Sequence, residues 1–425
     1  MNIFIEPQSS QWPELCARPQ LELDFLEGTV RNILLRVKQG GDAALKEFNR
    51  LYDGAETENL EVTIPEIQAA AGLIPPALKK AIETASANVE KFHRSQLQPV
   101  TKIETQPGVT CWRKAVPLER VGIYVPGGTA PLFSTVLMLA IPARIAGCTE
   151  TVLCTPPAKD GSIHPAILFA ASHAGVRRIF KAGGAQAIGA MAYGTPSIPA
   201  VQKIFGPGNQ YVTKAKEMVA REGLAIDLPA GPSELLVWAD EQANPMFVAA
   251  DLLSQAEHGT DSQVILVCNT ENTALAVINE LHKQLQNLPR KSIAEQALKN
   301  SRAIVFSRSA DALAFINTYA PEHLIINTGN AAQMAEEIKN AGSVFLGNYS
   351  PEAAGDYASG TNHTLPTNGY ARLYGGVSVE SFMKYITFQH ITQQGLMRLG
   401  ETVMEMARAE QLEAHATAIS VRLTF

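Results

Sequence analysis

The segment SQAEHG near the middle of the chain carries two side chains that can bind a metal ion. Gln255 and His258 are three residues apart at the end of an apolar, helix-like run, so both project from one face of the helix. An apolar strand, residues 263–268, follows at once and places this helix end between two buried elements. An imidazole and an amide oxygen held rigidly there are candidate zinc ligands, and other parts of the chain must complete the site.

A carboxylate and an imidazole stand side by side just before another apolar strand. Glu322 and His323 precede residues 324–327 and offer two bases whose unperturbed pKa values are about 4.3 and 6.5. For any single Glu-His dipeptide, a charged loop pair is the commoner explanation. From these residues alone, a pair of bases for proton transfer and an ordinary charged pair both remain open.

Two further segments supply candidate ligands. SPEAAGDYASGTNH holds Asp356 and His363, and a carboxylate suits zinc beside imidazole. This segment lies in residues 347–376, which are too long for a simple connection and are expected to form an ordered active-site loop. Near the C-terminus, Glu410 and His415 are about 140° apart around a helix axis. They can face one point only if the helix ends or bends between them.

Three glycine-rich loops follow predicted strands: residues 126–128, 183–186 and 206–209. Glycine lets backbone N–H groups approach a pyrophosphate, and the following helix N-terminus favours an anion. None of the loops is a G-x-G-x-x-G motif, and a single one is more often an ordinary turn. Three of them at one edge of a parallel sheet favour a dinucleotide, which Tyr124 at a strand end can contact.

The pattern of strands and helices places these residues in an α/β fold. Residues 121–234 alternate between the two and predict a parallel, doubly wound, Rossmann-like sheet. A second doubly wound unit follows, and we group residues 25–120 with 235–376 in the domain that carries the metal and catalytic residues. Residues 1–24 are expected to form an irregular arm, and residues 377–425 a helical tail.

The predicted sheets raise one difficulty for a common site. Gln255, His258 and the Glu322–His323 pair precede strands, whereas Asp356 and the glycine loops follow strands. In a parallel sheet these positions lie at opposite edges. Convergence requires the loop containing Asp356 to fold back, or the two units to bring different edges together.

Composition excludes several functional classes. The 425 residues carry a net charge of −6, which gives no basic surface for nucleic acid or an anionic membrane. The five cysteines include no C-x-x-C pair, so neither a disulfide framework nor a thiolate zinc site is expected. Without a signal peptide or a membrane-spanning apolar run, we expect a soluble, cytoplasmic protein.

Motifs along nearly the whole chain resemble the histidinol dehydrogenase family. They are LERVGIYVPGGTAPLFSTVLMLAIPARIAGC, GGAQAI, KIFGPGN, DLPAGPSE, DLLSQAEHG, YAPEHLI, SVFLG, SPEAAGDYASGTNH and a final A-E-x-L-x-A-H. The resemblance implies two aldehyde-dehydrogenase-like units in a homodimer with a shared active site. It also implies oxidation of L-histidinol to L-histidine through the aldehyde, the last steps of histidine biosynthesis, with two NAD and one zinc ion.

The resemblance assigns a role to each matching position. Glu322 and His323 match the catalytic pair. The implied zinc ligands are Gln255, His258, Asp356 and His415, the last from the partner subunit. The positions that match substrate contacts are Ser233, Gln255, His258, His323, Asp356, His363, Glu410 and His415. The positions that match NAD contacts are Tyr124, Gln186 and Asn209.

Three other functions remain open at this point. One is an NAD-dependent zinc dehydrogenase that oxidises another small polar alcohol to its acid. Another is a zinc hydrolase with Glu322 as general base, which would need neither NAD nor the glycine loops. The third is a non-catalytic relative, against which the complete set of candidate ligands argues.

Overall fold

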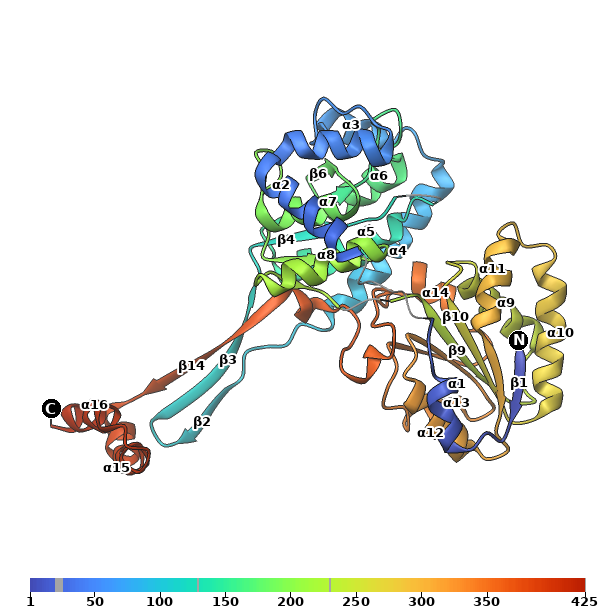
Figure 1. Cartoon of the computed structure of the whole chain (residues 1–425). Coiled ribbons are helices and arrows are strands. Elements are labelled where there is room, and N and C mark those ends of the chain that lie inside the picture. Colours follow the sequence, from blue (N-terminus) through green and yellow to red (C-terminus); the bar gives the residue numbers. More distant parts are fainter. Residues whose placement is uncertain (20–25, 128–129, 229–230, 425) are drawn as a thin grey trace.

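The computed structural model describes residues 1–19, 26–127, 130–228 and 231–424 (Figure 1). Two α/β lobes lie next to each other, and a long arm extends from one of them to a pair of helices at the C-terminus. Gly128 of the first predicted glycine loop lies outside the described residues. None of the helices in these ranges is both long and apolar enough to cross a bilayer.

The first lobe is built on a six-stranded parallel sheet, in the order β1-β11-β10-β9-β12-β13. Its strands β9 and β10 are buried at every residue because helices cover both faces, which explains their almost unbroken apolar sequences. The strands are β1 (Asn2–Ile5), β9 (Glu234–Ala239), β10 (Gln263–Cys268), β11 (Arg302–Val305), β12 (His323–Asn327) and β13 (Ser343–Leu346). The helices are α1 (Trp12–Leu15), α9 (Pro245–Ala256), α10 (Glu271–Leu285), α11 (Lys291–Ala297), α12 (Ser309–Tyr319), α13 (Ala331–Ala335) and α14 (Glu352–Tyr357).

The N-terminus corrects one expectation. Residues 1–24 were predicted to be irregular, but β1 pairs in parallel with β11 at the edge of the six-stranded sheet. A strand of four residues that ends near a proline gives too short an alternation to be recognised from sequence alone.

The second lobe contains a five-stranded parallel sheet, in the order β6-β5-β4-β7-β8. Together the two sheets confirm the predicted fold class of two doubly wound units. The strands are β4 (Arg120–Tyr124), β5 (Glu150–Thr155), β6 (Arg178–Lys181), β7 (Lys203–Phe205) and β8 (Ala225–Ile226). The helices are α2 (Leu26–Phe48), α3 (Ile64–Ala70), α4 (Pro76–Arg94), α5 (Phe133–Ala146), α6 (Pro165–Ala174), α7 (Gly184–Tyr193) and α8 (Gln210–Arg221).

The N-terminal helices pack on the five-stranded sheet, not on the six-stranded one. Helix α2 contacts α7 and α8, α3 contacts α6, and α4 contacts α5. The grouping of residues 25–120 with 235–376 is therefore wrong for these helices. Their apolar faces predict burial but carry no information about which sheet they cover.

A three-stranded antiparallel sheet forms the arm (Figure 1). The hairpin of β2 (Lys102–Gln106) and β3 (Val109–Pro117) turns at Gly108, which has a left-handed φ of 85°. The third strand, β14 (Met383–Ile391), pairs with β3 along its whole length. The tail from residue 377 is therefore not helical throughout, because the β-branched and aromatic side chains of KYITFQHI favour a strand beside β3.

Helices α15 (Gln393–Ala409) and α16 (Glu413–Leu423) pack against each other at the far end of the arm (Figure 1). The helix breaks between the two candidate residues: Glu410 caps α15, Gln411 has a φ of 61°, and His415 lies in α16. The break removes the angular obstacle to Glu410 and His415 facing one point. Large apolar side chains remain exposed on this helix pair, including Met397 and Met406 at 56% and 63%.

Candidate active site

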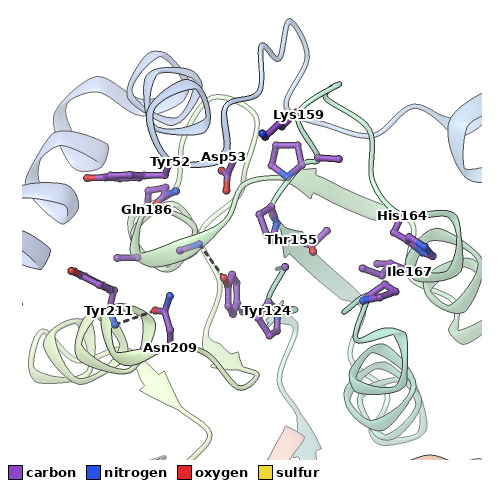
Figure 2. A pocket seen from close by; sticks show the side chains of 18 of the residues that line it. Tyr52, Asp53, Tyr124, Thr155, Lys159, His164, Ile167, Gln186, Asn209 and Tyr211 are labelled. Carbon is purple, nitrogen blue, oxygen red and sulfur yellow. Dashed lines mark hydrogen bonds between the residues drawn. The ribbon is translucent and has the colours of Figure 1, made fainter. Parts of the chain in front are cut away.

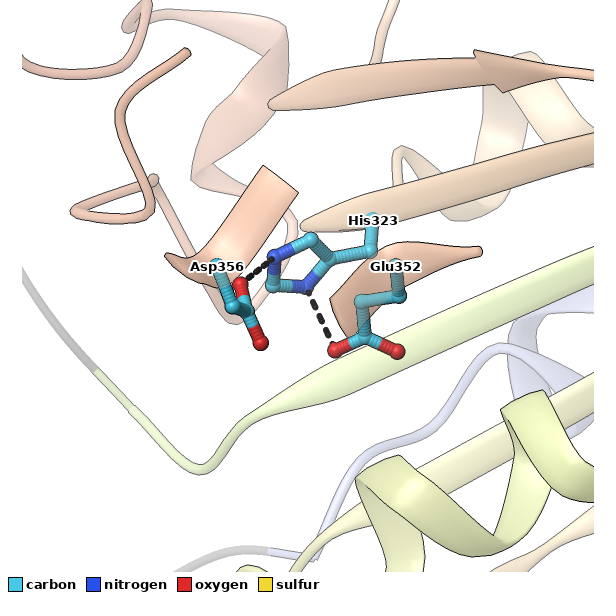
Figure 3. Close-up of side chains that lie close together, drawn as sticks. All are labelled: His323, Glu352 and Asp356. Atoms are coloured by element: carbon cyan, nitrogen blue, oxygen red, sulfur yellow. Dashed lines mark ion pairs between the residues drawn. The ribbon is translucent and has the colours of Figure 1, made fainter. Parts of the chain in front are cut away.

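His323 lies at the centre of a buried polar cluster. It is the first residue of β12, so the sheet fixes its backbone, and only 4% of it is exposed. Its Nδ1 lies 3.3 Å from the carbonyl oxygen of Glu234 and 3.5 Å from Oε1 of Glu352, while its Nε2 lies 3.5 Å from Oδ1 of Asp356 (Figure 3). The predicted catalytic imidazole thus contacts a predicted zinc ligand directly.

The Glu322 carboxylate is held beside this imidazole by the backbone of β9. Its Oε2 accepts a hydrogen bond of 2.8 Å from the N–H of Glu234. The Glu234 side chain is itself fixed by two hydrogen bonds from the buried guanidinium of Arg18, at 2.6 and 2.9 Å. Burial raises the pKa of Glu322 to about 7, which is a suitable value for a general base at neutral pH.

Gln255 and His258 approach the cluster from the end of α9. Gln255 is completely buried, and within the described residues neither its amide oxygen nor its amide nitrogen has a hydrogen-bond partner. Orphaned amide atoms are rare in a protein interior and indicate a missing ligand. His258 lines the same cavity as Glu322 and His363, and desolvation lowers its pKa while the charge of Asp356 raises it, so the end of α9 lies near the cluster.

His363 connects the two lobes. Its Nδ1 lies 2.8 Å from the backbone oxygen of Asp356, and its Nε2 lies 3.3 Å from the hydroxyl of Thr135. Thr135 belongs to α5 of the five-stranded lobe, whereas Asp356 belongs to α14 of the six-stranded lobe. The segment that contains Asp356 therefore folds back across the boundary between the lobes, as the sequence required.

A cavity of about 530 Å³ opens at this boundary. Ser233, His258, Glu322 and His363 line it, together with the glycine loop of residues 206–208 that follows β7. The amino edge of the six-stranded sheet thus meets the carboxyl edge of the five-stranded sheet. Because the two edges belong to different sheets, residues that precede strands of one sheet can share a cavity with residues that follow strands of the other.

The cluster around His323 contains more acid than base. Burial lowers the pKa of His323, but the carboxyl groups of Glu352, Glu322 and Asp356 outweigh this effect and raise it to about 10. Burial also raises the pKa of Glu352 well above its usual range. The carboxylate of Asp356 and the unpartnered amide oxygen of Gln255 are donors that fit a divalent cation, which these residues and His258 would hold. In the described residues, the candidate ligand atoms that lie within 4.8 Å of one another are those of His323, Glu352 and Asp356.

A second cavity, of about 960 Å³, lies at the carboxyl edge of the five-stranded sheet (Figure 2). Tyr124, Gln186 and Asn209 all line it, so the three residues predicted to contact NAD are brought together. The Tyr124 hydroxyl accepts a hydrogen bond of 3.0 Å from the N–H of Gly184 at the start of α7. A cavity at helix N-termini beyond the strand ends suits a dinucleotide.

Two of the predicted site residues lie far from the other site residues in this chain, and one residue that was not predicted belongs to the cluster around His323. Glu410 and His415 lie with α15 and α16 at the end of the arm, away from both lobes (Figure 1). Glu352 was not predicted, although it belongs to the same SPEAAGDYASGTNH segment as Asp356. Its spacing of four from Asp356 was the available signal, since a short helix there would place both carboxylates on one face.

Comparisons with known proteins agree with this geometry. Residues 16–423 match the family described as histidinol dehydrogenase. The chain belongs to the histidinol dehydrogenase family. A histidinol dehydrogenase of Bacteroides thetaiotaomicron is 57% identical over 423 residues, which cover 100% of this chain and 99% of the relative. One of Xylella fastidiosa strain Temecula1 is 52% identical over 93% of this chain and 92% of its own.

A solved structure extends the match to three dimensions. The crystal structure of histidinol dehydrogenase from Elizabethkingia anophelis superposes with a TM-score of 0.98 at 54% identity, covering 100% of this chain and 98% of that chain. The arm and its terminal helices are therefore part of the fold that this histidinol dehydrogenase shares. The predicted family resemblance is confirmed.

Proposed function

We propose that this protein oxidises L-histidinol to L-histidine through L-histidinal, as the last steps of histidine biosynthesis in the cytoplasm. The observation that carries the proposal is the contact of His323 with Glu322 and Asp356 beside a cavity between the lobes that His258 also lines. A second cavity with the residue types expected for NAD adjoins the same glycine loop. A zinc hydrolase would have no use for that second cavity.

Zinc, when bound by these residues, would orient the substrate through its imidazole and amine, and NAD would accept one hydride in each of the two oxidations. His323 takes the alcohol proton in the first oxidation. Glu322, with its raised pKa, takes a proton from the water that adds to the aldehyde before the second oxidation. The cavity between the lobes limits escape of the aldehyde.

We further propose that the active site is shared by two subunits. His415 would complete the zinc ligands and Glu410 would contact the substrate, both from the partner's arm. The exposed apolar side chains of α15 and α16 support this assignment, because a helix pair with so small a core needs another surface. Ser233 and His363 line the substrate cavity from the same chain as the catalytic pair.

The stoichiometry of NADH formation tests the reaction. Purified protein with zinc and limiting L-histidinol is expected to form two NADH per substrate. One NADH per substrate would indicate oxidation to the aldehyde only, and none would contradict the proposed activity. Removal of zinc by a chelator is expected to abolish the reaction and added zinc to restore it, whereas activity that withstands chelation would contradict the metal site.

A further inference from the structure

Arg18 belongs to the N-terminal segment, yet its side chain lies at the amino edge of the six-stranded sheet, beside the catalytic pair. The side chain is 10% exposed and has no part in the proposed chemistry. Its Nε and Nη2 donate hydrogen bonds of 2.6 and 2.9 Å to the two carboxyl oxygens of Glu234, the first residue of β9. A paired, planar contact of this kind fixes the orientation of both groups, so Arg18 anchors the start of β9.

The same guanidinium also binds the end of the helix that leads into the catalytic pair. Its Nη2 donates to the carbonyl oxygen of Tyr319, the last residue of α12, at 2.7 Å and lies 3.4 Å from that of Ala320. These carbonyl groups lack partners within the helix, and an arginine can supply them. Ala320 has a left-handed φ of 54°, which is unfavourable without glycine and persists only where the surroundings stabilise it.

Glu322 is attached to both of the groups that Arg18 binds. Its backbone follows Ala320 by two residues, and its Oε2 accepts the 2.8 Å hydrogen bond from the N–H of Glu234. The side chain of Glu322 lines the cavity between the lobes. One arginine side chain thus determines the separation of the two points that place the Glu322 carboxylate in that cavity.

We propose that Arg18 is a positioning residue for Glu322. It keeps the end of α12 and the start of β9 at a fixed separation, so that the carboxylate retains its bond to the N–H of Glu234 and lies within reach of the water that adds to the aldehyde. A displacement of about 1 Å at a catalytic group can slow a reaction about 100-fold. This inference rests on the proposed function, in which Glu322 serves the second oxidation and His323 the first.

Arg302 provides a matched control. Its Nη1 donates to the carbonyl oxygens of Leu15 and Ala17 at 2.6 and 3.2 Å, so it also secures the N-terminal segment. Within the described ranges it forms no hydrogen bond or ion pair with Glu234 or with the end of α12. Arg302→Met therefore removes an anchor of the same segment and leaves the contacts around Glu322 in place.

The test compares Arg18→Met with Arg302→Met in the zinc-loaded protein. In single turnover, Arg18→Met is expected to slow the oxidation of supplied L-histidinal about 10- to 100-fold, with a much smaller loss in the oxidation of L-histidinol and an unchanged zinc content. Arg302→Met is expected to retain both rates. Equal slowing of the two oxidations, equal slowing in the two variants, or an unchanged rate with L-histidinal would overturn the proposal.

A double mutant separates positioning from a merely structural effect. If Arg18 acts through Glu322, Arg18→Met should have little further effect on the oxidation of L-histidinal in a Glu322→Gln background. An equal fractional loss in both backgrounds would overturn the proposal. Failure of the proposed function itself is recognised separately, because the wild-type protein would then form fewer than two NADH from each L-histidinol.

A second variant keeps the test decisive if Arg18→Met does not fold. Arg18→Lys retains the positive charge but offers a single nitrogen, which cannot reproduce the planar contact with Glu234 and bind the carbonyl group of Tyr319 as well. This variant should also oxidise L-histidinal more slowly than the wild type, while its oxidation of L-histidinol is largely retained. A wild-type rate with L-histidinal would show that the charge alone is sufficient and would overturn the proposal.

Discussion

Nε2 of His323 lies 3.5 Å from Oδ1 of Asp356, although one residue starts an interior strand and the other belongs to a helix in the following long segment. This contact joins a predicted base to a predicted zinc ligand. Burial raises the pKa of Asp356, but hydrogen bonding to His323 and the nearby imidazoles outweigh it and lower that pKa. Asp356 is therefore kept as the anion that a zinc ligand must be.

Replacement of Gln255 by Met should have opposite effects on stability and on zinc binding. The metal-free protein should gain roughly 1 to 3 kcal/mol of unfolding free energy, because two orphaned buried amide atoms disappear. Zinc affinity should fall strongly, as measured by competition with a chromogenic chelator. The matched control is Gln263→Met, which is expected to destabilise because this buried amide bonds to Ala17, Asn300 and Tyr319. A variant of Gln255 that binds zinc normally would remove it from the ligand set.

Replacement of Glu322 by Gln should impair the second oxidation more than the first. The amide keeps the hydrogen bond from the N–H of Glu234 but cannot take a proton from water. We expect a loss of about 10²- to 10⁴-fold in the oxidation of L-histidinal, and a much smaller loss in the single-turnover oxidation of L-histidinol. Stopped-flow traces that show equal slowing of both steps would contradict the division of roles between Glu322 and His323.

The partly buried carboxyl group of Asp251 predicts a pH-dependent change in stability. Burial raises its pKa from 3.8 to about 7 in the folded protein, so the folded state retains a proton that the unfolded state has lost. The free energy of unfolding therefore falls as pH rises from about 4 to about 7. Asp251→Asn should restore this free energy, because the amide does not ionise. Urea unfolding should show a gain of about 1 to 2 kcal/mol at pH 8 and a smaller one at pH 5. An equal gain in unfolding free energy at pH 5 and at pH 8 would mean that Asp251 does not titrate between these pH values.

Complementation between two inactive variants tests the shared site. Glu322→Gln and His415→Ala should each be inactive in the full reaction as homodimers. Mixed, dissociated and reassembled, they should regain activity, because a heterodimer has one site with both an intact Glu322 and an intact partner arm. Recovery of up to about a quarter of wild-type activity is expected, since random assembly makes half of the dimers mixed and each has one good site. Absence of recovery, with mixed dimers confirmed by mass, would place His415 in the same subunit's site.

The sequence predicted the parts of the fold that periodicity alone determines. ELLVWA and QVILVC are apolar at nearly every position, and both are strands buried on two faces. The site residues could be grouped by their chemistry and by family motifs. Their convergence could not be derived, because it depends on the amino edge of one sheet meeting the carboxyl edge of the other. The sequence also did not predict where α2 packs or that β14 pairs with β3, because both depend on partners distant in sequence.

Glu352 shows why the buried cluster itself was difficult to predict. In the sequence it is one acidic residue in a polar segment, equivalent to many that are solvated. Only the return of α14 to the start of β12 makes it 1% exposed and places it beside His323. Burial is a property of the assembled lobes, and no local pattern encodes it.

The hydrogen bond between Thr135 and His363 crosses from one lobe to the other at the wall of the cavity between the lobes. Both lobes line this cavity, so its width depends on how the two lobes are placed relative to each other. Rotation of one lobe by a small hinge angle would open the cavity and break this hydrogen bond at the same moment. If the proposed oxidation takes place in this cavity, retention of the aldehyde would depend on the timing of lobe separation and not on the affinity of any single contact.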